Sequence, residues 1–131
     1  PHVNPHRLER PRRIGPFLVE PVHVEHGPLN GCQGYRLGAR PGGLAYLPDV
    51  KRIPETSLAQ LQDLDLLILN CLRPRPHNSH LSLEEAVAYA TELKPKRCLF
   101  THMTHDIDPA IHSRLIPSWA AFAHDGLVVD I

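Results

Sequence analysis

The alternation of apolar and polar residues predicts that the first half of the chain is rich in strands. Residues 17–26 (FLVEPVHVEH) contain many β-branched side chains and partly alternate, which is typical of a strand. Pro21 favours an edge position or a bulge, because proline cannot donate a ladder hydrogen bond. Two shorter strands are predicted at 33–38 and 44–47. Clusters rich in turn-forming residues separate the three strands, at 27–31 and 39–43. This spacing predicts an antiparallel meander.

The second half alternates between helical and strand patterns. Leucines spaced three apart after Pro54 predict a short helix, and the apolar run 65–72 (DLLILNCL) predicts a strand covered on both faces. Ser82 opens a second helix through a capping box with Glu85, and Pro95 ends that helix. The remaining elements are expected at 97–101 (strand), 108–115 (helix) and 127–131 (strand). Together with the meander, this order predicts an α/β sandwich with a mixed sheet.

The first sixteen residues differ from the rest of the chain. They are rich in proline and arginine and show no sustained apolar period. We therefore expect 1–16 to be an extended arm or linker, and 17–131 to be the folded unit.

Charge and cysteine content narrow the function classes. The chain has 14 basic and 14 acidic residues, so it lacks the field that attracts nucleic acid or anionic membranes. Its apolar runs are far shorter than the roughly 20 residues of a membrane span. Its three cysteines form no C-x-x-C pair, which disfavours a disulfide framework and favours a cytoplasmic location. General nucleic-acid binding and membrane association are therefore not expected.

Candidate chemistry lies at the predicted strand ends. His26 ends the first strand, Asp49 follows the third, His80 lies in the loop after the apolar strand, and His102 ends the next strand. Loops at strand ends of α/β sheets converge on one crevice. Imidazole nitrogens and carboxylate oxygens are ligands for zinc, manganese or iron, and a carboxylate such as Asp49 can bridge two ions. Metal hydrolases use such ions to activate water.

Each of these residues also has a structural interpretation. A single histidine at a strand end is usually solvated or hydrogen bonded, and Asp49 alone could be a turn residue or a helix cap. Only the recurrence of such residues at strand ends favours a shared metal site. Three H-x-x-H pairs occur in the chain, and residues three apart on a strand point to opposite faces. We therefore expect one member of each pair at the site, with His77 and His105 as candidates for groups that orient the ligands.

Five sequence blocks together resemble a known family. They are VEHGPLNGCQGYRL, LAYLPDV, LLILNCLRPRPHNSHLSLEEA, LKPKRCLFTHMTHDID and HDGLVVDI. In this order they resemble the metallo-β-lactamase superfamily, and in particular its phosphonate-pathway (PhnP-like) phosphodiesterases. The resemblance implies an αββα sandwich, a two-metal site (zinc, manganese or iron) and hydrolysis of a small phosphodiester by metal-activated water. His26 and His102 would each bind one metal, Asp49 would bridge both, and His80 would contact the phosphate or protonate the leaving oxygen.

One part of the family pattern is missing. The signature H-x-H-x-D-H, which belongs to the N-terminal half of the family fold, does not occur in this chain. The resemblance therefore implies the C-terminal half of the sandwich, a mixed sheet flanked by helices. We expect its apolar inner face to be covered by an N-terminal half or by a second copy of the chain. The main hypothesis is a metal-dependent hydrolase. A non-catalytic binding or assembly module, and an unrelated α/β protein with incidental histidines, are the alternatives.

Overall fold

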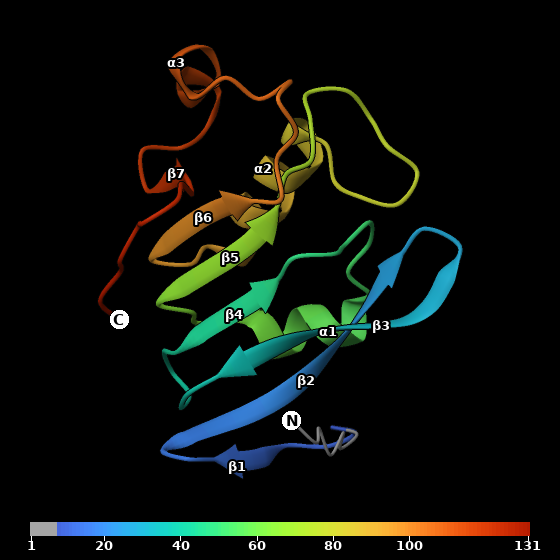
Figure 1. Cartoon of the computed structure of the whole chain (residues 1–131). Helices are drawn as coiled ribbons and strands as arrows, with labels where there is room; N and C mark the ends of the chain where they lie inside the picture. The colour runs from blue at the N-terminus through green and yellow to red at the C-terminus, as the bar shows by residue number, and fades with distance from the viewer. Residues whose placement is uncertain (1–7) are drawn as a thin grey trace, which may run out of the picture.

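Seven strands of the computed structural model, which describes residues 8–131, form one sheet whose spatial order follows the chain order (Figure 1). Pairing is antiparallel from β1 to β4 and parallel from β4 to β7, so the sheet is mixed, as the sequence predicted. The strands are β1 (Arg12–Ile14), β2 (Phe17–His26), β3 (Leu29–Leu37), β4 (Leu44–Leu47), β5 (Leu66–Asn70), β6 (Arg97–Thr101) and β7 (Ala120–Phe122).

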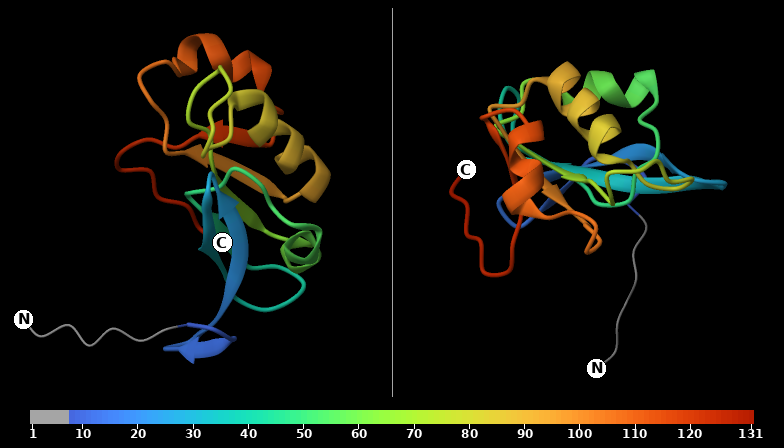
Figure 2. Two further views of the ribbon diagram at one scale, coloured as in Figure 1. Left: turned by 90° about the vertical axis from the view of Figure 1, so that its right-hand side faces the viewer. Right: turned by 90° about the horizontal axis from the view of Figure 1, so that it is seen from above.

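Helices α1 (Glu55–Leu58) and α2 (Leu83–Leu93) lie on one face of this sheet in both views of Figure 2. A 3₁₀ turn extends α1, and the short α3 (Pro109–His112) is extended in the same way. The predicted capping box is confirmed, because Ser82 accepts from the backbone N–H of Glu85 while the Glu85 side chain accepts from Ser82. Lys94 ends α2 in the left-handed conformation, one residue before Pro95. None of the described helices has the length and apolar character needed to cross a membrane.

The core lies between this sheet face and the two helices. Register places Leu47 beside Leu69, and Leu69 beside Phe100, so alternate residues of three adjacent strands share the covered face. All three side chains are fully buried. The helical side contributes further buried residues to this core, among them Leu61, Ala86 and Ala90. Burial of each large side chain contributes about 1.5–3 kcal/mol.

The opposite sheet face is also apolar but only partly covered. Tyr35 pairs with Tyr46, and Tyr46 pairs with Ile68. Tyr46 is 42% exposed, and the other two side chains are half-buried. The C-terminal segment runs beside β6, where the Arg97 guanidinium donates to the carbonyl oxygen of Asp130 at 3.2 Å. The sheet therefore presents two apolar faces, of which α1 and α2 cover one.

The predicted strand at 127–131 is wrong. The strand that pairs with β6 on the side away from β5 is β7, where Ala120 pairs with Cys98, and Phe122 pairs with Phe100. Phe122 is buried, whereas Val128 is 85% exposed. The segment 127–131 has a suitable composition for a strand, but β7 already occupies the free edge of β6.

The N-terminal elements also differ from the expectation. Within the predicted arm, Arg12–Ile14 forms β1, because Gly15 adopts a positive φ and lets the chain turn back so that Ile14 pairs with Phe17. Residues 1–7 of that arm lie outside the described residues. The turn expected at 27–31 is shorter, since the ladder between β2 and β3 continues to the pair His26 and Leu29.

Candidate metal site

Strand direction brings the four candidate residues to one edge of the sheet. Strand β2 runs antiparallel to β3, which runs antiparallel to β4, so β2 and β4 share a direction that β5 and β6 also follow. Their carboxyl ends therefore lie along the same edge. His26 is the last residue of β2, Asp49 follows β4, His80 lies between β5 and α2, and His102 follows β6.

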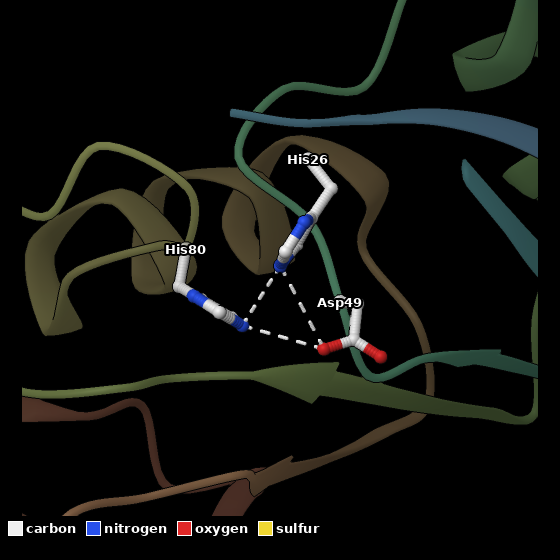
Figure 3. A group of neighbouring side chains, drawn as sticks. All are labelled: His26, Asp49 and His80. Carbon is white, nitrogen blue, oxygen red and sulfur yellow. Dashed lines mark hydrogen bonds and ion pairs between the residues drawn. The ribbon is translucent and has the colours of Figure 1, made fainter. Parts of the chain in front are cut away.

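Three imidazoles surround one carboxylate oxygen at this edge. Nε2 of His80 lies 3.3 Å from Oδ1 of Asp49, and the corresponding distances are 3.7 Å for His102 and 3.9 Å for His26. Nε2 of His26 and Nε2 of His80 are 3.1 Å apart. Figure 3 shows His26, Asp49 and His80 pointing toward one another, with the second carboxylate oxygen directed away. The predicted convergence is found, and the individual roles of the four residues remain predictions.

The spacing of these donor atoms fits a small divalent cation. Ligand atoms about 2.1 Å from a tetrahedral zinc lie roughly 3.4 Å from one another. The four separations of 3.1, 3.3, 3.7 and 3.9 Å lie around that value. His26, Asp49 and His80 each offer one ligand atom within 4.8 Å of the others. The cluster therefore has the chemistry and the dimensions of a metal site.

His80 is the most enclosed of the four residues. Its side chain is 13% exposed, against 21% for His26 and 45% for both His102 and Asp49. Burial lowers the pKa of His80, and the imidazoles of His26 and His102 lower it further, against an opposing hydrogen bond that the Asp49 carboxylate accepts. Burial in this position therefore favours the neutral imidazole of His80. The His80 ring also stacks on that of His102, with centroids 4.8 Å apart.

Asp49 is held in place by its backbone neighbours. The buried Asn70 side chain accepts from the backbone N–H of Val50 at 3.1 Å. Nζ of Lys51 then contacts the Glu85 carboxylate of α2 at 2.6 Å. Sequence analysis did not identify Asn70, although a polar residue ending the run LLILN was the available signal.

The histidines expected to orient the ligands lie in different surroundings. Nδ1 of His77 is 3.2 Å from the Ser79 hydroxyl, which is 3.0 Å from Nδ1 of His80, so His77 connects to the cluster through Ser79. The His105 side chain is 97% exposed and its Nε2 lies 3.7 Å from the Asp106 carboxylate. Its orienting role remains a prediction. Sequence analysis did not identify Ser79, which carries no family signal of its own.

A family comparison agrees with this geometry. Residues 1–103 match the model of the β-lactamase superfamily domain, which is well over half of the chain. The chain belongs to the β-lactamase superfamily. This establishes the family that the five sequence blocks indicated.

Solved structures show how much of the superfamily fold the chain represents. It resembles a diphosphatase of the PhnP family with a TM-score of 0.85 and 36% identity, over 93% of this chain and 46% of that one. It also matches the metallo-β-lactamase fold protein YhfI of Bacillus subtilis, with a TM-score of 0.76 and 21% identity, over 93% of this chain and 53% of that one. The chain thus has about half of the metallo-β-lactamase fold and about half the length of these relatives.

A curated relative shows a similar partial match. The chain is 28% identical over 121 residues to an octanoyltransferase of Porphyromonas gingivalis, covering 91% of this chain and 24% of that protein. This match again includes nearly all of the chain and a minor part of the relative.

Proposed function

We propose that the polypeptide carrying this chain is a metal-dependent hydrolase of a small phosphodiester-type substrate, and that this chain supplies the C-terminal half of its two-metal site. The observation that supports it most directly is the cluster of three imidazoles within 3.3–3.9 Å of one Asp49 oxygen. The likeness to a diphosphatase at 36% identity supports a phosphoryl substrate.

The four residues divide into ligands and a reactive group. His26, Asp49 and His102 would hold the cations, with Asp49 using its second oxygen to reach the other ion. Zinc, manganese or iron bound there would polarise a phosphoryl oxygen and lower the pKa of a bound water. His80 would contact the phosphate or protonate the leaving oxygen, since its Nε2 faces the same centre.

The remaining ligands would come from an N-terminal half of the same fold. This chain matches only 46% of the diphosphatase, and its Tyr35, Tyr46 and Ile68 form an apolar surface on the face opposite α1 and α2. A second sheet packed there would bury that surface. In the full-length polypeptide, Tyr46→Asp then destabilises by much more than the ~0.5 kcal/mol typical of a surface substitution. Stability that depends on protein concentration would instead indicate a second copy of the chain.

Metal content and turnover test the assignment of roles. The full-length polypeptide is purified, its zinc, manganese and iron are measured by elemental analysis, and hydrolysis of bis(p-nitrophenyl) phosphate is followed. We expect His102→Gln to lower both metal content and turnover. We expect His80→Gln to lower turnover while metal content is kept. His124→Gln, at an exposed histidine bonded to the backbone of Asp125, serves as the matched control.

Two results would contradict the proposal. A full-length preparation that binds none of the three metals and shows no turnover would favour a non-catalytic binding or assembly module, whereas unchanged turnover in His102→Gln would refute the role of His102 as a metal ligand. Loss of metal in His80→Gln equal to that in His102→Gln would make His80 a ligand, and the role of proton donor would then be wrong.

A further inference from the structure

We propose that Gly27 and Ser79 are positioning residues, whose contact sets how closely the imidazole of His80 approaches that of His26. Gly27 directly follows His26, and Ser79 directly precedes His80. The two pairs of residues meet where the loop between β5 and α2 reaches the end of β2. The inference rests on the proposed function, since it concerns the same centre. It gives this contact a task in holding His80 in place.

The contact requires a residue without a side chain at position 27. Gly27 has a φ of +59°, a conformation that residues other than glycine rarely adopt. A Cβ built there would lie 2.8 Å from Cβ of Ser79 and 3.2 Å from Cα of the same residue. Carbon atoms in ordinary contact are about 3.5–4.0 Å apart, so an alanine at position 27 would require a shift of about 1 Å. The backbone fixes both of the clashing atoms, so rotation of a side chain cannot provide that shift.

The loop, rather than β2, should give way to such a clash. The ladder between β2 and β3 continues through His26. The preceding residue, Glu25, exchanges backbone hydrogen bonds with Arg52 at 2.9 and 3.1 Å. Ser79 lies in the segment 74–80, which is outside the strands and helices. A residue larger than glycine at position 27 would therefore displace Ser79, and His80 with it.

A displacement of His80 changes the spacing of the donor atoms. Nε2 of His80 is 3.1 Å from Nε2 of His26 and 3.3 Å from Oδ1 of Asp49. The two imidazole rings meet edge to face, with centroids 4.5 Å apart. A shift of about 1 Å is large against these separations, and a misplacement of that size can cost roughly a hundredfold in rate. The absence of a side chain at position 27 therefore lets His80 reach the centre.

The test compares two glycines that have the same backbone conformation. Gly15 has a φ of +58°, and a Cβ built there meets nothing within 4 Å among the described residues. In the full-length polypeptide, Gly27→Ala and Gly15→Ala thus add similar backbone strain, and only Gly27→Ala adds the clash. We expect Gly27→Ala to lower kcat for bis(p-nitrophenyl) phosphate roughly tenfold to a hundredfold with metal content kept. Gly15→Ala should keep the parent kcat.

Nuclear magnetic resonance follows the geometry without metal. In the metal-free full-length polypeptide, the imidazole C–H protons of His26 and His80 are assigned from His26→Gln and His80→Gln. The nuclear Overhauser cross-peak between the two rings is then measured. A shift of about 1 Å should weaken this cross-peak about threefold in Gly27→Ala, because its intensity falls with the sixth power of the distance. Gly15→Ala should keep the parent intensity.

A second change in the loop separates the clash from the Ser79 hydroxyl. Gly27→Ala is combined with Ser79→Gly, which removes the clashing Cβ, and with Ser79→Ala, which keeps it. Both changes remove the hydroxyl. We expect Ser79→Gly to restore most of the cross-peak and of kcat, and Ser79→Ala to restore neither. If Gly27→Ala folds only together with Ser79→Gly, a parent-like cross-peak in that double variant supports the inference, and a weakened one overturns it.

The remaining outcomes separate this inference from the proposed function. Equal kcat and equal cross-peaks in Gly27→Ala and Gly15→Ala would overturn the inference, because the clash would then be absorbed without moving His80. Equal relief of Gly27→Ala by Ser79→Gly and by Ser79→Ala would also overturn it. A full-length protein without metal or turnover would refute the proposed function alone, since the cross-peaks of the metal-free protein still decide the inference.

Discussion

Asn70 allows a quantitative test of how the Asp49 segment is supported. Its side chain is fully buried, its oxygen accepts from the N–H of Val50 at 3.1 Å, and its Nδ2 has no hydrogen-bond partner among the described residues. Asn70→Asp has the same shape and keeps the acceptor, but it places a carboxyl where one donor is available. Asp49, one residue before Val50, adds a second carboxylate nearby.

The expected loss in the free energy of unfolding follows from the pKa of the new carboxyl. Burial with a single donor favours the neutral acid and raises its pKa, and a shift of about 2–3 units corresponds to about 3–4 kcal/mol. A carboxyl whose pKa is higher in the folded protein than its unfolded value of about 3.9 destabilises the protein as the pH rises from about 3.9 through the folded pKa. Asn70→Asp should thus be near the parent at pH 4 and much less stable at pH 8.

Urea denaturation measures this difference. The single tryptophan, Trp119, packs against the core and reports unfolding by fluorescence. With a slope of about 2 kcal/mol per molar urea, the midpoint at pH 8 should fall by about 1.5–2 M. Asn78→Asp makes the same change in an exposed loop and should shift stability by less than about 0.5 kcal/mol. Equal midpoints for Asn70→Asp and the parent at pH 8 would refute the support that we assign to this residue.

Four further outcomes are expected. Ser82→Ala removes the cap of α2 and should cost about 1 kcal/mol in urea denaturation. Arg36→Met removes a fully buried guanidinium that donates to three backbone carbonyls, and should cost about 2–4 kcal/mol in the same assay. Burial raises the pKa of Cys71 and of Cys98 to about 12, so neither thiol should react with a disulfide reagent at pH 8 until urea unfolds the chain. Because burial lowers the pKa of His80, stability should fall as pH drops below about 6.5, and His80→Gln should flatten that fall.

Much of the fold could be predicted because several elements carry strong local signals. The strands expected at 17–26, 44–47 and 97–101 have the bounds of β2, β4 and β6. Each is a short β-branched or apolar run between turn-forming residues. The short β7 has no such signal, because a run of two alanines and a phenylalanine becomes a strand only through its pairing with β6. The same holds for β1, where arginines form a strand beside β2.

From the sequence, the candidate site could be predicted as far as the types of residue that form it and the strand ends at which they lie. His26, Asp49, His80 and His102 could be selected because parallel strands bring their carboxyl ends together. The groups that hold them could not be selected, since serine and asparagine are common in loops and at strand ends. Their importance depends on distances of about 3 Å that arise only after folding.

The agreement between spatial order and chain order has a consequence for how the site is assembled. Each strand pairs with the strand made just before it, so the sheet can grow from β1 to β7 as the chain emerges during synthesis. The donor residues follow the same sequence, with His26 arriving first and His102 last. A nascent chain that stops before β6 would hold an incomplete set of donors, so a cation bound as we propose would be captured with high affinity only late in folding.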